Sequence, residues 1–172
     1  NTTFDAGSGN LTLGGKVDGA YSLALNSTGM TTLGDTLGAG TPLSSLTTDA
    51  GGTVVIQGGR ITTSGTQTYN EIVRLQSDTT FTGSTVTFND AVEGAGDLSV
   101  VGAAVLNAGA INTTGAQSYS STVTLVRDTV LTANSVGFAG AVNSSASGVS
   151  ALTVNSSGST SFDGAVGDTH AL

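Results

Sequence analysis

Apolar residues alternate with polar ones along many short segments of this chain. The alternating pairs are Val73 and Leu75, Val86 and Phe88, Leu98 and Val100, Val123 and Leu125, Val136 and Phe138, and Leu152 and Val154. A period of two residues indicates β-strands that bury one face. Clusters such as NSTG, DAGG, EGAGD and NSSG separate these segments and indicate turns. The pattern therefore predicts strands of about four to seven residues joined by tight turns.

The chain also contains internal repeats. Residues 61–92 reappear without a gap as residues 111–142, at a displacement of 50 residues. The identical pairs include Gly65 and Gly115, Gln67 and Gln117, Tyr69 and Tyr119, Val73 and Val123, Leu75 and Leu125, Asp78 and Asp128, and Phe88 and Phe138. Residues 23–38 similarly resemble residues 152–167, at a displacement of 129 residues. We therefore expect residues 1–172 to form one segment of a longer repeat array.

Two architectures use many short strands of this kind, the antiparallel sandwich and the parallel solenoid. A sandwich would repeat as a whole domain of about 80 to 100 residues, so a displacement of 50 residues is too short for it. In a solenoid, each turn stacks on the previous one and buries its inward residues against equivalent residues. We therefore predict an all-β fold, a parallel β-helix or β-solenoid of about six or seven coils. Each coil would hold about 25 residues, so that the shorter repeat spans two coils.

Composition agrees with an almost entirely β chain and limits its partners. There are 26 glycines, one proline, no cysteine and no tryptophan, and the formal net charge is −8. Four scattered cations cannot form the basic face that nucleic acids require, and they disfavour binding to anionic membranes. No apolar run approaches the roughly 20 residues of a membrane-spanning helix. We therefore expect no nucleic-acid partner and no membrane insertion of this segment.

Enzyme chemistry has little support in the residues present. The only histidine is His170, close to the end of the chain, so a nucleophile paired with a histidine base is not expected. One histidine and no cysteine cannot supply the usual ligands of zinc. We predict that the protein is not an enzyme and has no catalytic residues and no obligatory cofactor.

The densest acidic cluster contains Asp90, Glu93 and Asp97, and the second copy of the repeat lacks these acids. Acidic residues on a coil surface could cleave or bind a polysaccharide, and their oxygens could hold Ca²⁺. The segment is also a typical glycine-rich turn, which is the interpretation that we favour. Calcium and glycan binding at these three residues remain alternative hypotheses.

Two residue types recur at equal positions of the repeat. Asp78 and Asp128 are expected to open turns and to accept N–H groups two residues further along the chain. Tyr69 and Tyr119 are expected to lie over the edge of the coil with their hydroxyl groups in solvent. An exposed column of tyrosines stacking on sugars is the alternative.

The repeats resemble a known class of proteins. The phrases VDGAYSLALNSTGMTTLGDTLGAGTPLSSLTTDAGG and ITTSGTQTYNEIVRL are similar to the repeats of filamentous-haemagglutinin-like exoproteins and giant β-strand-repeat adhesins of Gram-negative bacteria. The likeness extends over nearly the whole chain. It implies a right-handed parallel β-helix that is exported by a two-partner or autotransporter-like route and displayed outside the cell. It implies no catalytic residues.

These observations predict a structural stalk in a secreted bacterial surface adhesin, which holds a distal binding region away from the cell. One alternative is a self-assembling extracellular fibre, sheath or matrix protein, and another is a carbohydrate-binding β-helix. We expect self-association end to end or side by side, because the outermost coils leave strand edges unpaired. A host or matrix glycan or protein is a further possible partner.

Overall fold

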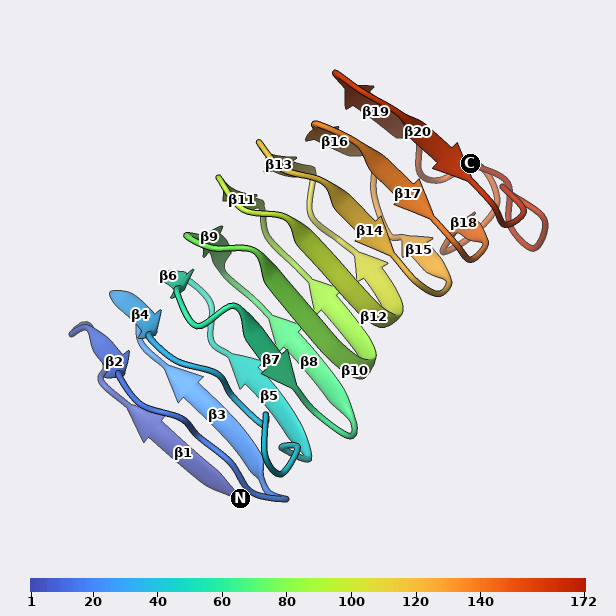
Figure 1. The fold of residues 1–172 in the computed structure, drawn as a ribbon. Coiled ribbons are helices and arrows are strands. Elements are labelled where there is room, and N and C mark those ends of the chain that lie inside the picture. The colour runs from blue at the N-terminus through green and yellow to red at the C-terminus, as the bar shows by residue number, and fades with distance from the viewer.

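The computed structural model describes residues 1–172, and it contains strands β1 to β20 and no helix. Figure 1 shows the strands stacked in successive coils along one axis, with the two termini at opposite ends. The larger sheet has twelve strands, β1 (Thr2–Asp5), β3 (Ser22–Asn26), β5 (Ser45–Thr48), β7 (Arg60–Thr62), β8 (Thr66–Tyr69), β10 (Thr79–Phe88), β12 (Leu98–Leu106), β14 (Gln117–Tyr119), β15 (Val123–Leu125), β17 (Val136–Phe138), β18 (Val142–Ser144) and β20 (Thr160–Phe162). The smaller sheet has eight strands, β2 (Leu11–Leu13), β4 (Met30–Leu33), β6 (Thr53–Ile56), β9 (Ile72–Leu75), β11 (Val92–Gly94), β13 (Ala110–Thr113), β16 (Thr129–Ala133) and β19 (Leu152–Ser156).

Each coil has three sides, and every strand pairing is parallel. Side I consists of β1, β3, β5, β8, the second halves of β10 and β12, β15 and β18. Side II is the smaller sheet. Side III consists of β7, the first halves of β10 and β12, β14, β17 and β20. The chain runs through sides I, II and III in turn, so the predicted parallel β-solenoid is confirmed.

The coils are shorter and more numerous than the sequence suggested. The smaller sheet has eight strands, one for each turn, so the solenoid has about eight turns, where six or seven were predicted. Val86 pairs with Ala104, 18 residues further along, whereas Val136 pairs with Thr160, 24 residues further along. The prediction was wrong because it assumed coils of equal length, and in the structure the corners between the strands take up unequal numbers of residues.

A continuous apolar core runs through the centre of the coils. Thirty buried residues form one cluster, and they come from all three sides. Strand β10 shows the alternation that builds this core, because Phe81, Val86 and Phe88 are fully buried while their neighbours point outward. On side III, the rings of Tyr119, Phe138 and Phe162 stack with centroid separations of 5.2 Å and 4.8 Å. Burial of one such ring stabilises the fold by roughly 2 to 3 kcal/mol.

The 50-residue repeat does not span a whole number of coils. Gln67 lies on side I, where it pairs with Val86, but its counterpart Gln117 lies on side III, where it pairs with Val136. The chain therefore passes eight sides between the two copies, which is two turns and two thirds. The expectation that the repeat equals two coils was wrong. Equivalent residues of the repeat face the core from different sides instead of forming one column.

The same local structure nevertheless forms at both places. The Gln67 Nε2 group donates hydrogen bonds to the carbonyl oxygens of Ile61 and Thr82 and to the Thr63 hydroxyl, at 3.3, 2.8 and 3.3 Å. The amide of Gln117 binds the three equivalent residues, which are Ile111, Thr113 and Thr132, at 3.0, 3.3 and 3.1 Å. Each buried glutamine thus satisfies backbone groups inside a corner, once between sides III and I and once between sides II and III.

The two recurring tyrosines lie inside the coil, which contradicts the expectation that their hydroxyl groups face solvent. Tyr69 is fully buried and Tyr119 is 1% exposed. Each hydroxyl donates a hydrogen bond to the glutamine two residues before it, Gln67 or Gln117, at 3.0 and 3.3 Å. Burial raises the pKa of both tyrosines above the usual value. The glutamine explains the difference, because it provides the buried partner that a tyrosine hydroxyl needs.

The corners are held by hydrogen bonds between coils rather than within a turn. Asp78 accepts a hydrogen bond from the Asp97 N–H at 2.9 Å, and Asp128 accepts one from the Ala151 N–H at 2.8 Å. Both donors belong to the following coil, so the expectation of a bond two residues along was wrong. An amide ladder at another corner joins three asparagines, Asn70, Asn89 and Asn107.

Candidate functional site

The three acids of the predicted cluster face different neighbours. The Asp90 carboxylate accepts a hydrogen bond from the next N–H group of the chain, at 2.7 Å. Glu93 forms an exposed ion pair with Arg74, with 2.6 Å between Oε1 and Nε. Asp97 accepts a hydrogen bond from the Ala116 N–H at 2.7 Å. No group of three or more His, Cys, Asp or Glu side chains in residues 1–172 lies close enough together to hold a metal ion.

His170 belongs to the C-terminal segment, which folds back over side I of the last coil. Its carbonyl oxygen accepts a hydrogen bond from the Ser144 N–H at 3.2 Å, while its side chain is exposed. The carbonyl of Ala171 accepts a hydrogen bond from Gly148 at 2.9 Å. The segment therefore contributes backbone contacts to the fold. The structure contains no helix with the length and apolar character needed to cross a membrane.

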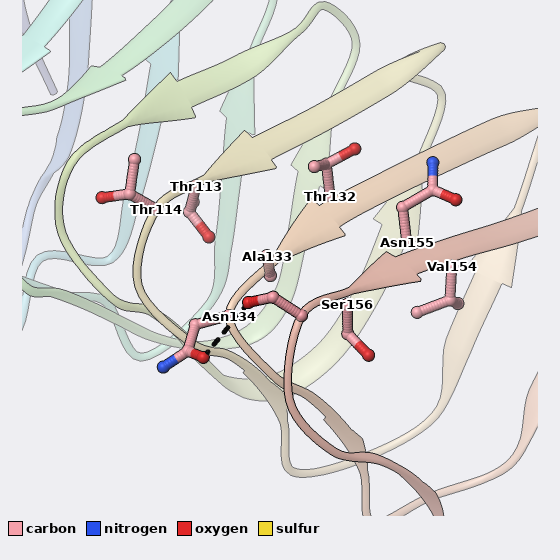
Figure 2. A pocket seen from close by; sticks show the side chains of 9 residues that line it. Thr113, Thr114, Thr132, Ala133, Asn134, Val154, Asn155 and Ser156 are labelled. Atoms are coloured by element: carbon pink, nitrogen blue, oxygen red, sulfur yellow. Dashed lines mark hydrogen bonds between the residues drawn. The ribbon is translucent and has the colours of Figure 1, made fainter.

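A shallow cavity of about 630 Å³ lies at the end of side II, where β13, β16 and β19 run into their turns (Figure 2). Seven of its nine lining residues are polar and uncharged, and the other two are Ala133 and Val154. The polar residues are Thr113, Thr114, Thr132, Asn134, Asn155, Ser156 and Ser157. Parallel stacking explains the composition, because each coil places a hydroxyl or amide residue at the same position of its turn. We call this cavity the side II groove.

The side II groove presents hydrogen-bonding groups without charge. Thr132 and Asn155 are exposed on adjacent strands, and their side chains have no hydrogen-bond partner within the protein. Asn134 accepts a hydrogen bond from the Ser157 hydroxyl at 3.4 Å. An uncharged ligand with many hydroxyl groups, such as a glycan chain, matches these donors and acceptors. The groove contains no aromatic ring on which a sugar could stack.

A different corner contains a buried carboxylate. Glu71 lies between β8 and β9, at the corner from side I to side II, and it is 1% exposed. Neither of its carboxylate oxygens has a hydrogen-bond partner. Buried polar atoms usually have such a partner, and a buried charged group without one is costly.

The neighbouring coils surround this carboxylate with further oxygen atoms. A methyl group added at Gly52 would collide with Glu71 Oε2, with the Gly29 carbonyl oxygen and with the Ser27 carbonyl oxygen, so these three oxygens converge on one point. Asp49 binds the other face of the same peptide chain, because its Oδ1 accepts a hydrogen bond from the Ser27 N–H at 2.8 Å. We call Asp49, Glu71 and the carbonyls of Ser27 and Gly29 the Glu71 corner.

The electrostatics of the Glu71 corner disfavour a bare negative charge. Burial, followed by the charge of Asp49, raises the pKa of Glu71 to about 7, although Thr48 and Gly52 partly oppose this shift. The chain has one ion pair between side chains, which joins Arg74 and Glu93, so no lysine or arginine neutralises the corner. A proton or a bound cation would relieve the repulsion between the two carboxylates.

Sequence reasoning did not single out Glu71, although one signal was available. Glu71 and Glu93 are the only glutamates, and the position equivalent to Glu71 in the second copy of the repeat is Ser121. The departure from the repeat therefore marked this residue as much as it marked the acids near Glu93. Its burial and its approach to Ser27 and Gly29 depend on the stacking of three coils, which the repeat alone does not specify.

The comparisons with known proteins give no relative. No family model matches the chain, and no curated protein and no solved structure matches it either. The sequence and the geometry described above are therefore the basis for a proposal about function.

Proposed function

We propose that this chain is a structural stalk segment of a secreted bacterial surface adhesin, where it holds a distal binding region away from the cell. The observation that carries the proposal is the continuous stack of about eight parallel turns around a single core. The resemblance of the repeats to those of filamentous-haemagglutinin-like exoproteins supports the surface location. The proposal is independent of any ligand of the segment itself.

The mechanical argument starts from the hydrogen bonds. The chain has 102 backbone–backbone hydrogen bonds, and the ladders between coils run parallel to the axis. A force applied along the axis must break a coil's hydrogen bonds and expose its apolar residues before the next coil can open. Because the two termini lie at opposite ends of the stack, a load between them acts along this axis (Figure 1).

Single-molecule force spectroscopy tests the proposal, with the protein held by its two ends. Loss of one coil of roughly 19 residues releases about 65 Å of chain, so we expect a series of force peaks with this spacing. The Phe138→Ala variant should lower one peak, because Phe138 belongs to the core, whereas Val130→Ala at an exposed position should lower none. Release of the whole chain in one step at low force would contradict a load-bearing role.

A self-assembling fibre is the second candidate, and the two ends of the stack favour it. Apolar residues that would face the core of a further coil are exposed there, with Phe4 at 39%, Phe162 at 44% and Val166 at 49%. Strands β1 and β2 at one end, and β19 and β20 at the other, each pair on one edge only. Such edges can bind a second copy of the chain.

Sedimentation and electron microscopy across a concentration series test the fibre. End-to-end stacking predicts filaments that lengthen with concentration and that disappear in a Phe162→Glu variant. The matched control is Val101→Glu, at a residue that is 41% exposed on the side of the coil. Loss of association in the control alone would indicate side-by-side packing, and a monomer at all concentrations would reject self-assembly.

A further inference from the structure

We propose that the Glu71 corner binds one Ca²⁺ ion, with the carboxylates of Asp49 and Glu71 and the carbonyl oxygens of Ser27 and Gly29 as ligands. These residues come from three successive coils on the border of sides I and II. The bound ion would therefore join three coils that are otherwise connected by hydrogen bonds and apolar contacts. This inference does not depend on the proposed function.

Geometry provides the first argument. Glu71 is 1% exposed and both of its oxygens lack a partner, so the side chain is ordered in the interior without any group that explains its charge. The Oε2 atom faces the same point as the carbonyls of Ser27 and Gly29. The Ser27 carbonyl also accepts no hydrogen bond. Unused oxygen atoms from separate coils therefore converge, which a merely structural glutamate would not require.

Charge and donor type identify the ion. Two carboxylates without a lysine or arginine partner leave a charge of about −2 when both are ionised, which a divalent cation balances. All of the donors are carboxylate or carbonyl oxygens, and such ligands suit hard cations rather than zinc or copper. Ca²⁺ accepts irregular geometry and several protein oxygens, whereas Mg²⁺ requires a near-octahedral shell and keeps its waters. We therefore assign the site to Ca²⁺.

The stack places these ligands without strain elsewhere. Ser27 is fixed from both sides, because its N–H binds Asp49 and its hydroxyl donates to the Gly9 carbonyl at 2.6 Å. Gly52 leaves room for the Glu71 carboxylate, since any side chain at that position would meet it. Substitution of Gly52 by alanine would therefore remove the space beside the ligands without changing a charge.

Thermal unfolding in EDTA and in calcium chloride tests the site, with the Glu71→Gln variant and its matched control Glu93→Gln. If the affinity lies in the range of extracellular calcium modules, about 10 mM Ca²⁺ should raise the Tm of the wild-type protein by roughly 3 to 8 °C. Glu71→Gln should lose this shift, and Glu93→Gln should keep it. Should Glu71→Gln fail to fold, Asp49→Asn serves as the second variant, and it should reduce the shift.

Isothermal titration with calcium chloride gives the stoichiometry, for which we expect one ion per chain and weaker binding of Mg²⁺. A Tm that does not respond to Ca²⁺ in the wild-type protein would overturn the proposal, and would indicate that Glu71 carries a proton instead. An equal response in Glu71→Gln and the wild-type protein would also overturn it. Loss of the response in Glu93→Gln alone would move the site to the exposed acids.

Discussion

The buried pair of Gln117 and Tyr119 provides the most specific energetic prediction. Tyr119→Phe removes one hydroxyl and its hydrogen bond to Gln117, which should cost about 1 kcal/mol of unfolding free energy. Gln117→Leu removes an amide that donates to Ile111, Thr113 and Thr132, and it also leaves the Tyr119 hydroxyl buried without a partner. Each buried group left unsatisfied costs roughly 1 to 3 kcal/mol, so we expect a loss of about 3 to 4 kcal/mol.

The double variant separates the two contributions. In Gln117→Leu with Tyr119→Phe, the orphaned hydroxyl is absent, so the pair should cost no more than Gln117→Leu alone. The expected coupling energy is therefore about 1 to 2 kcal/mol. Because the contacts of Gln67 and Tyr69 are equivalent, the same cycle at that corner should give the same result.

Urea unfolding followed by circular dichroism measures the four free energies of each cycle. Tyr21→Phe is the control, because Tyr21 is only partly buried and its hydroxyl makes no hydrogen bond, and its cost should be near zero. Additive losses, with a coupling energy below about 0.3 kcal/mol, would refute the claim that the hydroxyl depends on the glutamine. A stabilising Gln117→Leu substitution would refute the claim that the amide satisfies the corner.

Three further predictions follow from burial, backbone conformation and stacking. The raised pKa values of Tyr69 and Tyr119 mean that above pH 10 the unfolded chain loses protons that the folded chain keeps. Stability should therefore fall as the pH rises further, and a Tyr21→Phe variant should show no tyrosinate absorbance before it unfolds. Gly102 has a φ of +125° and an added methyl group would collide with the Gly83 carbonyl, so Gly102→Ala should cost more than about 2 kcal/mol in urea unfolding. Gly109→Ala, where nothing lies within 4 Å, should be nearly neutral. Hydrogen exchange should be slowest in the central coils and fastest in the two terminal coils, and uniform protection would contradict the nearest-neighbour stacking.

The amino-acid sequence by itself determined the class of the fold and the residues of its core. Alternation such as Val86 and Phe88 is a local property, because successive side chains of a strand point to opposite faces whatever the strand pairs with. The repeat of residues 61–92 at residues 111–142 then excluded a sandwich and favoured a stack of coils. The glutamine and tyrosine of that repeat also carried their own hydrogen-bonding partners, although their burial was not foreseen.

Only the tertiary structure decided which coils meet, and with them the environment of each polar residue. The number of residues in a corner varies from coil to coil, so the register between strands about 20 residues apart cannot be counted from the sequence. That register places Gln67 and Gln117 on different sides, directs Asp78 to the N–H group of the next coil, and brings Glu71 beside Ser27. Local pattern fixes which way a side chain points along its own strand, whereas its neighbours come from other coils and depend on the whole stack.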